Sequence, residues 1–276
     1  MKQYAHTQAL IGAPLALSSR KLDIVRGLLA SGADDKALFG PVDDDARYAA
    51  QSITENVSGI AVISIKGILL PGSSNGWWWG GATFYDDISN AINLAAQDET
   101  VRGIILHVNS PGGAVAGCFD TGDRIYAARE SKPVIAIVDE QACSAAYALA
   151  CSAEKIVLPR TGEVGSIGVV YLHADITKFL DETGIKVTTF QTGARKTDTY
   201  PTTPMSEDAQ KIIQSDIESM GKLFFETVAR NRGLSAQDVQ DMEAAVFYGQ
   251  DAVSAGLADA VMSRDSAFLD FLAHLK

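Results

Sequence analysis

The stretch 133–153, PVIAIVDEQACSAAYALACSA, decides the fold class. It opens with an apolar run that closes at Asp139 and Glu140, and a helical pattern of small residues begins at residue 144. Continuous apolar strands are typical of parallel sheets that are covered on both faces. The stretch therefore predicts a buried strand that turns directly into a helix, with one hydroxyl group, that of Ser144, placed among alanines at the junction.

The same alternation continues on both sides of this stretch. Apolar or β-rich runs predict strands over 59–70, 101–110, 133–140 and 154–159, with 186–191 as a candidate fifth strand. Helical patterns predict helices over 84–97, 114–130, 144–153, 175–183 and 206–232, and two shorter helices within 234–246 and 249–257. Strands that alternate with helices form parallel βαβ units. We therefore expect an α/β fold with a parallel β-sheet of repeated βαβ units and C-terminal helices.

The pattern divides the chain into three segments. Residues 1–56 are expected to form an N-terminal extension, in which apolar residues at helical spacing predict an amphipathic helix over 18–33 and a polar connector follows. The α/β domain is expected over 57–263, and residues 264–276 are expected to form a C-terminal tail helix.

Composition and charge restrict the classes of partner. Of the 276 residues, 47% are apolar and 21% are charged, which is typical of a folded domain. The net charge of −11 argues against binding to nucleic acid or to anionic lipid. Because no secretory signal and no apolar run of transmembrane length is evident, we expect a soluble, cytoplasmic protein without a membrane span.

The cysteines and histidines give no sign of a metal or a disulfide framework. Cys118, Cys143 and Cys151 are odd in number and contain no CxxC pair, which suits a reducing compartment. The four histidines lack metal-ligand spacing. We therefore expect neither a metal nor another cofactor.

Ser144 is the first candidate for chemistry. A helix start leaves backbone N–H groups unpaired and carries partial positive charge, so a serine there can attack a substrate while the N–H group of Ala145 stabilises an oxyanion. The alternative is that Ser144 only caps the helix, as most serines at helix starts do. Gly112 and Gly113, in the strand-to-helix turn SPGG, either supply a second oxyanion donor or form an ordinary tight turn.

A serine nucleophile needs a base, and the sequence offers three candidates. His107 lies on the strand before the SPGG turn, His173 follows an apolar run, and Lys196 lies in a loop rich in glycine and threonine. A lysine acts as a base only where burial or a nearby cation lowers its pKa. Ser166, in the stretch GEVGSIGVV, either bonds to the backbone or orients another group. The residues alone leave these alternatives open.

Three consecutive tryptophans, Trp77, Trp78 and Trp79, stand out in the glycine-flanked stretch SNGWWWGGATFYDD. A cluster of this kind is either a substrate or subunit contact, or is partly buried against the sheet edge. The sequence favours neither interpretation.

Five stretches taken together resemble the signal peptide peptidase A family of serine proteases, and most closely its phage branch, the lambda-type capsid assembly proteases. In chain order they are VNSPGG, ACSAAYALACSA, GEVGSIGVV, TGARK and AAVFYGQDAVSAGLADAV, and the resemblance covers about residues 57–263. It implies a serine endopeptidase with a Ser–Lys dyad, on the fold shared by the Clp protease subunit and the crotonases. Ser144 matches the nucleophile and Lys196 the general base.

The resemblance also implies the roles of neighbouring residues. Gly112, Gly113 and Ala145 match the oxyanion hole, and Ser166 matches the serine that orients the lysine. Active sites of this family lie in ring-like oligomers, in which the serine and the lysine can come from neighbouring subunits. We therefore expect a homo-oligomer that cleaves a polypeptide, such as a phage scaffold or capsid protein, in the host cytoplasm or the procapsid. Phage relatives often continue into a C-terminal scaffolding region, which we expect to be a separate polypeptide or to have been removed.

Three other functions fit parts of the pattern: a soluble housekeeping peptidase of the same family, a catalytically inactive capsid-assembly protein with the same fold, and a crotonase-like acyl-coenzyme A enzyme. The retained serine and lysine disfavour the last two. Ala145 and Ala146 stand where the family commonly has one or two glycines. Their methyl groups predict a narrow site that prefers small residues at the cleavage point.

Overall fold

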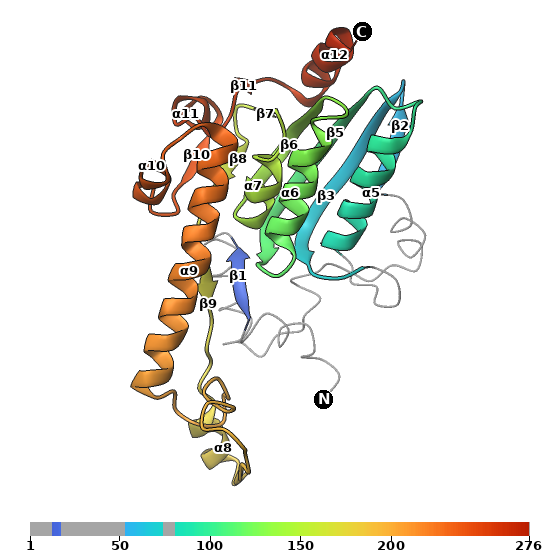
Figure 1. The fold of residues 1–276 in the computed structure, drawn as a ribbon. Helices are drawn as coiled ribbons and strands as arrows, with labels where there is room; N and C mark the ends of the chain where they lie inside the picture. Colours follow the sequence, from blue (N-terminus) through green and yellow to red (C-terminus); the bar gives the residue numbers. More distant parts are fainter. Residues whose placement is uncertain (1–12, 18–52, 74–80, 276) are drawn as a thin grey trace.

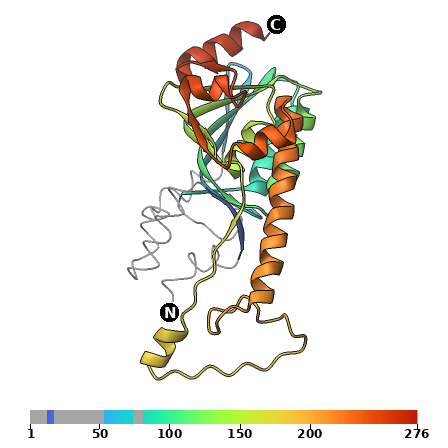
Figure 2. The same cartoon turned by 90° about the vertical axis from the view of Figure 1, so that its left-hand side faces the viewer.

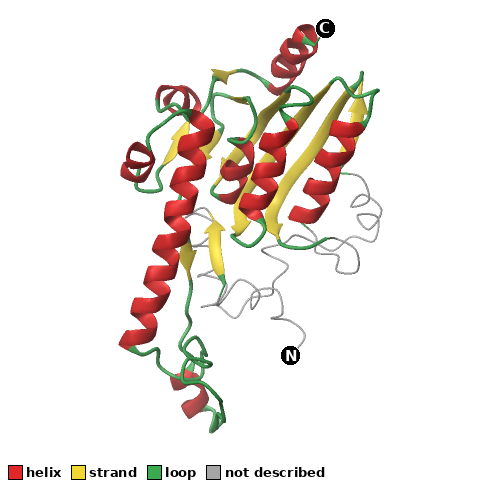
Figure 3. Ribbon diagram, in the orientation of Figure 1, coloured by secondary structure: helices red, strands yellow, loops and turns green. Residues whose placement is uncertain are grey.

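The computed structural model describes residues 13–17, 53–73 and 81–275 of the chain. Its described part is built on one sheet of 11 strands. Helices α5, α6 and α7 cover one face of this sheet, and the long helix α9 runs down beside it (Figure 1). Figure 3 shows the same arrangement by element type, with α5, α6 and α7 in front of the strands.

The sheet is mostly parallel at its centre. Strands β3, β5 and β6 pair in parallel, β6 pairs in parallel with β7 and β8, and the antiparallel pairs lie around them. The strands are β1 (Pro14–Leu17), β2 (Thr54–Val57), β3 (Ile60–Leu70), β4 (Ala82–Phe84), β5 (Gly103–Ala114), β6 (Val134–Cys143), β7 (Lys155–Leu158), β8 (Glu163–Gly165), β9 (Val170–Tyr171), β10 (Val246–Tyr248) and β11 (Ala260–Val261).

Helices follow most of the parallel strands, as βαβ units require. They are α5 (Tyr85–Gln97), α6 (Cys118–Ala128), α7 (Ala145–Ala150), α8 (Thr177–Glu182), α9 (Glu207–Arg232), α10 (Ala236–Asp241), α11 (Gly249–Ser254) and α12 (Arg264–His274). The predicted α/β class with a parallel sheet and C-terminal helices is confirmed by this topology.

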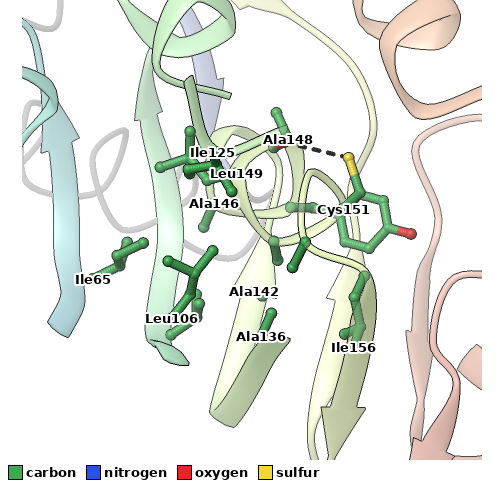
Figure 4. Close-up of a cluster of buried hydrophobic side chains, with 14 of the residues drawn as sticks. Ile65, Leu106, Ile125, Ala136, Ala142, Ala146, Ala148, Leu149, Cys151 and Ile156 are labelled. Atoms are coloured by element: carbon green, nitrogen blue, oxygen red, sulfur yellow. Dashed lines mark hydrogen bonds between the residues drawn. The ribbon is translucent and has the colours of Figure 1, made fainter. Parts of the chain in front are cut away.

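Two hydrophobic cores lie on opposite faces of the sheet. In β5, Ile104, Leu106 and Val108 join the larger core, whereas Ile105 joins a smaller core with Phe271 of α12. This split follows from the two-residue period of a strand, which points successive side chains to opposite faces. Figure 4 shows part of the larger core, where small side chains of α7 pack against the strands. Because α7 is short and four of its six residues are alanines, it lies close to the sheet and positions the strand end before it.

Helix α9 ends where its sequence predicts. Ser206 caps its N-terminus by accepting a hydrogen bond from the N–H group of Ala209 at 3.1 Å. Gly233 ends it in the left-handed region, with φ of 68°, where glycine carries no Cβ penalty. The C-terminal end of α9 packs on the body of the protein, and its other end lies far from that body, beside the segment that contains α8 (Figure 2).

The expected fifth strand over 186–191 is wrong. These residues lack regular secondary structure and are exposed throughout. A β-rich composition stabilises a strand only where a neighbouring strand pairs with it, and among the described residues none pairs with this segment.

Parts of the expected N-terminal extension belong to the sheet. Strand β1 pairs antiparallel with β5, and β2 pairs antiparallel with β3. The helix predicted over 18–33 and the tryptophans Trp77–Trp79 lie outside the described residues. At the other end of the chain, α12 occupies most of the expected tail helix over 264–276.

Candidate active site

Ser144 lies at the junction between β6 and α7, in a backbone conformation that few residues adopt. Its φ is 56° and its ψ is −122°. For a residue with a side chain, a positive φ of this kind costs of order 1–3 kcal/mol and persists only where the surroundings impose it. The N–H group of Ser144 donates to the carbonyl oxygen of Gly165 at 2.7 Å, which helps to impose it. Strained residues of this type gather at functional sites.

The hydroxyl group of Ser144 does not cap α7. A capping serine accepts a hydrogen bond from the N–H group two or three residues ahead, and the Ser144 side chain makes no such bond. Instead, its Oγ lies 3.4 Å from the carbonyl oxygen of Gly168. Ser144 therefore does not have the usual capping role of a serine at a helix start. Its hydroxyl remains directed at the loop that follows β8.

Gly112 faces Ser144 across the end of the sheet. Its φ is 108°, and a Cβ atom placed on it would lie 2.1 Å from the carbonyl oxygen of Ala16 and 3.0 Å from Cβ of Ser144. No side chain fits at such distances, so glycine is required here for both space and conformation. A Cβ atom on Gly113 would lie 1.9 Å from the carbonyl oxygen of Leu69. The two glycines thus let three strand segments approach one another beside Ser144.

The N–H groups of the two glycines differ in their partners. The Gly112 N–H group donates to Oγ of Ser110 at 3.2 Å, and the Ser110 hydroxyl donates to the carbonyl oxygen of Gly67 at 2.6 Å. Gly113 lies in register with Ala16 of β1. The Gly112 N–H group therefore already has a partner within its own turn, whereas Gly113 faces β1. Ala145 is the first residue of α7, where N–H groups have no partner within the helix.

Ser166 lies beside Ser144 and also has a positive φ. Strands β6 and β8 pair in parallel as far as Cys143 and Gly165, so each serine is the residue directly after a paired strand position. Ser166 has φ of 53°, is buried, and its N–H group donates to the carbonyl oxygen of Ala245 at 2.8 Å. Both serines therefore have a positive φ, and each donates its backbone N–H group to a carbonyl oxygen of another segment of the chain.

Lys196 does not lie beside Ser144 within one chain. It belongs to the segment between α8 and α9, which extends away from the body that carries α7 (Figure 2). Its side chain is exposed, so the burial that we expected for a lysine base is absent from the single chain. Within one chain, the structure brings together Ser144, Gly112, Gly113, Ala145 and Ser166, but not Lys196.

The two histidines considered as bases lie elsewhere. His107 points to the face of the sheet that α12 covers, with Nε2 3.6 Å from Oδ2 of Asp139, at a cavity of about 610 Å³. Burial lowers its pKa, and Lys66 and Arg264 lower it further. His173 follows β9 and is partly buried. Among the described residues, neither histidine forms a hydrogen bond with Ser144.

Two residues near the glycine turn escaped the sequence analysis. Ser110 shapes the turn through the two hydrogen bonds given above, and its place directly before Pro-Gly-Gly was a usable signal. Tyr85, the first residue of α5, is buried and donates from its hydroxyl to the carbonyl oxygen of Ala114 at 2.6 Å. Nothing in the local sequence distinguishes this tyrosine from an ordinary core aromatic.

The three cysteines are buried, and no disulfide joins them. Burial raises the pKa of the Cys118 thiol to about 12 and that of Cys151 to about 11, so neither supplies a thiolate nucleophile at neutral pH. Among the residues that the structure describes, no cluster of histidine, cysteine or carboxylate side chains has the arrangement of a metal site. Likewise, none of the described helices is long and apolar enough to cross a membrane.

A family model described as Peptidase family S49 matches residues 127–275, which is more than half of the chain. The chain belongs to peptidase family S49. The matched region of this S49 chain contains Ser144, Ala145, Ser166 and Lys196. The resemblance inferred from the five sequence motifs is thus confirmed at the level of the family.

Curated relatives place the chain near phage members of the family. It is 36% identical over 225 residues to capsid assembly protease C of Escherichia phage lambda, covering 82% of this chain and 51% of that relative. It is 37% identical over 211 residues to head-tail preconnector protein GP5 of Enterobacteria phage P21, covering 76% and 42%. Protease 4 of Haemophilus influenzae is 28% identical over 244 residues, covering 87% and 39%. The chain therefore spans about half, or less, of the length of these relatives.

Among solved structures, the chain is similar to a ClpP1 mutant from Listeria monocytogenes. The TM-score is 0.45 and 16% of the residues are identical, with 74% of this chain and 92% of that chain covered.

Proposed function

We propose that this S49 member is a serine endopeptidase of phage or prophage head assembly, in which Ser144 is the nucleophile and Lys196 the general base. Its substrates are scaffold or head proteins, by analogy with the phage relatives, one of which is named a capsid assembly protease. The observation that carries the proposal is the conformation of Ser144. It is a strained serine at a strand-to-helix junction, it caps no helix, and it lies against Gly112.

In the proposed reaction, Ser144 Oγ attacks the carbonyl carbon of the scissile peptide bond while a neutral Lys196 amine accepts its proton. The negative charge that develops on the carbonyl oxygen is stabilised by the N–H groups of Gly113 and Ala145. Removing one donor of this kind typically costs about 3–4 kcal/mol of transition-state stabilisation. The leaving amine then takes the proton, and water hydrolyses the acyl-enzyme in a second step.

A second copy of the chain supplies Lys196 in this proposal. The segment between β9 and α9 carries the lysine and exposes large apolar side chains, which include Phe179, Ile185, Val187 and Phe190. Phe190 is 92% exposed. Exposed apolar surface of this extent is typical of an interaction site. Packing of this segment against a neighbouring copy would bury both the apolar side chains and the lysine, and burial lowers the pKa of a lysine.

The test of the dyad compares the wild type with Ser144→Ala and Lys196→Ala on a denatured protein mixture and on the head proteins encoded nearby. New peptide termini are identified by mass spectrometry, and each variant is first checked for the wild-type oligomeric mass. The proposal expects termini that appear with the wild type and vanish with both variants. A wild type that cleaves neither substrate would instead support an inactive assembly protein. Lys211→Ala serves as a control for the loss of one exposed lysine.

The source of the lysine is tested by mixing the two inactive variants after reversible dissociation. If Ser144 and Lys196 act across a subunit boundary, mixed oligomers contain some sites with both residues, and part of the activity returns. If both residues come from one chain, every site lacks one of them and the mixture stays inactive. Recovery of activity therefore supports the second copy, and its absence contradicts it.

A further inference from the structure

Strand β1 lies in the place that a substrate of Ser144 would need. It pairs antiparallel with β5 on one side, where Leu15, Ala16 and Leu17 oppose Ala114, Gly113 and Gly112. On its other side it pairs antiparallel with β9, where Pro14 and Leu15 oppose Tyr171 and Val170. Figure 1 shows β1 between the sheet and β9. Both flanking elements belong to the site, since β5 carries the glycine turn and β9 follows Ser166.

The register of β1 directs one carbonyl group at the catalytic elements. In antiparallel pairs, hydrogen-bonded positions recur every second residue. The Val115 N–H group donates to the carbonyl oxygen of Pro14 at 3.2 Å, so the next hydrogen-bonded position toward the turn is Ala16 opposite Gly113. A Cβ atom placed on Gly112 would lie 2.1 Å from the Ala16 carbonyl oxygen and 3.0 Å from Cβ of Ser144. The Ala16 carbonyl oxygen and Ser144 are thus both close neighbours of Gly112.

Burial shows that β1 is packed closely between these elements. The side chains of Leu15 and Ala16 are 0% and 1% exposed. Ala16 joins the core that contains Ala145 and Ala146. Peptide ligands often bind as an extra strand at a sheet edge, where main-chain hydrogen bonds give affinity and side-chain pockets give specificity. Strand β1 shares the main-chain pairing and the buried side chains of such a ligand, although it belongs to the same chain.

From this geometry we infer that residues 14–17 occupy the substrate groove as an internal substrate strand and present the Ala16–Leu17 peptide bond to Ser144 for self-cleavage. The inference rests on the proposed function for its chemical step. Ser144 Oγ bonds to the carbonyl carbon of Ala16, the bond from that carbon to the nitrogen of Leu17 breaks, and the Leu17 amine leaves with the proton from Ser144. Water then hydrolyses the ester, which frees Ser144 and leaves Ala16 with a carboxylate.

The placement of β1 is tested first, without any need for catalysis. In a Ser144→Ala background, cysteines replace Pro14 and Tyr171, which are opposed in register. By the alternation above, this pair is not hydrogen-bonded, and its side chains are close enough for a disulfide. The full-length chain is oxidised mildly, and peptide mapping under non-reducing conditions looks for the cross-link. Pro14→Cys with Val170→Cys is the control, because a slip of one residue turns the side chains to opposite faces.

A cross-link in the first variant and none in the control supports the inference. Equal cross-linking in both, or in neither, overturns the placement of β1 in the groove. This readout does not depend on Ser144 being a nucleophile.

The cleavage is tested on the full-length wild type by intact mass and N-terminal sequencing. The inference expects a product that begins at Leu17, which disappears in Ser144→Ala and in Ala16→Trp, because a large side chain does not fit where Ala16 is buried. A wild type that cleaves other polypeptides but keeps its Ala16–Leu17 bond would overturn the presentation of this bond. A wild type that cleaves nothing contradicts the proposed function instead, and the cross-link alone then decides the placement of β1.

Discussion

The backbone N–H group of Ser144 donates to the carbonyl oxygen of Gly165 at 2.7 Å, so the end of β8 holds the residue that follows β6. Directly after Gly165, Ser166 also has a positive φ, and its own N–H group donates to the carbonyl oxygen of Ala245. Two serines with a positive φ therefore lie side by side, and the N–H group of each donates to a carbonyl group from another segment of the chain. The conformation of the candidate nucleophile depends on this lateral support.

Replacing Gly112 by alanine is expected to lower kcat/KM about 100-fold or more, on the scale of losing an oxyanion donor. The added methyl group would overlap the carbonyl oxygen of Ala16 and lie too close to Cβ of Ser144. Gly72→Ala is the control, because Gly72 also has a positive φ, of 84°, but a Cβ atom there would meet nothing within 4 Å. Peptidase assays on both variants should show loss in the first only, whereas equal losses would assign the effect to backbone strain.

Removing the Tyr85 hydroxyl should lower the proposed peptidase activity, although this hydroxyl bonds to Ala114 and not to the candidate nucleophile Ser144. Tyr85→Phe leaves the buried carbonyl oxygen of Ala114 without this donor, and we expect a loss of about 1–2 kcal/mol in the free energy of unfolding. The turn before Ala114 should also loosen, which should lower kcat more than it raises KM. Tyr147→Phe is a matched control, because the Tyr147 hydroxyl donates to the carbonyl oxygen of Leu257 at 2.9 Å. Denaturation curves should show similar losses in the free energy of unfolding for the two variants. Kinetic assays should show a lower kcat for Tyr85→Phe only.

The ion pair between Arg232 and Asp259 is expected to stabilise the C-terminal helices. The two side chains join through two hydrogen bonds of 2.9 Å and 3.0 Å, and the Arg232 side chain is 7% exposed. Arg232→Met should lower the free energy of unfolding by about 1.5–3 kcal/mol, the range for hydrogen bonds to charged groups. Arg230→Met removes the exposed pair with Asp123 and should cost at most about 1 kcal/mol. Urea denaturation measures the free energy of unfolding of both variants. Equal losses in the two would contradict this prediction.

Stability is expected to fall on mild acidification because of His107. Its pKa in the folded chain lies below the usual 6.5, mainly through burial and then through Lys66, while Asp139 opposes the shift. The folded state therefore binds a proton less readily than the unfolded state does. The contribution of His107 to the free energy of unfolding is fully present above pH 6.5. It is lost as the pH falls from there through the lowered pKa of His107. His107→Gln should weaken this pH dependence in thermal or chemical denaturation.

The exposed His274 provides the control for that experiment. His274→Gln should leave the pH dependence of stability as it is in the wild type. A wild-type curve that is flat between pH 6.5 and the acid limb of the carboxylates would show that His107 does not carry the effect.

The sequence predicted the βαβ framework because its signals are local. Apolar runs such as 133–140 are long enough to be buried, and the helical period of 206–232 ends at a serine cap and a glycine. The same locality explains the wrong strand at 186–191, where a β-rich composition had no strand to pair with. Propensity alone does not supply such a partner.

By itself, the sequence determined the fold class, the family, and the position of Ser144 between a buried strand and a helix of small residues. Only the tertiary structure decided which groups surround that serine. Gly112, Gly165 and Ala16 come from distant parts of the chain, and their contacts with the site depend on strand pairing and register. The structure also leaves Lys196 exposed and away from Ser144, because a local motif fixes the type of residue but not the surface against which it packs.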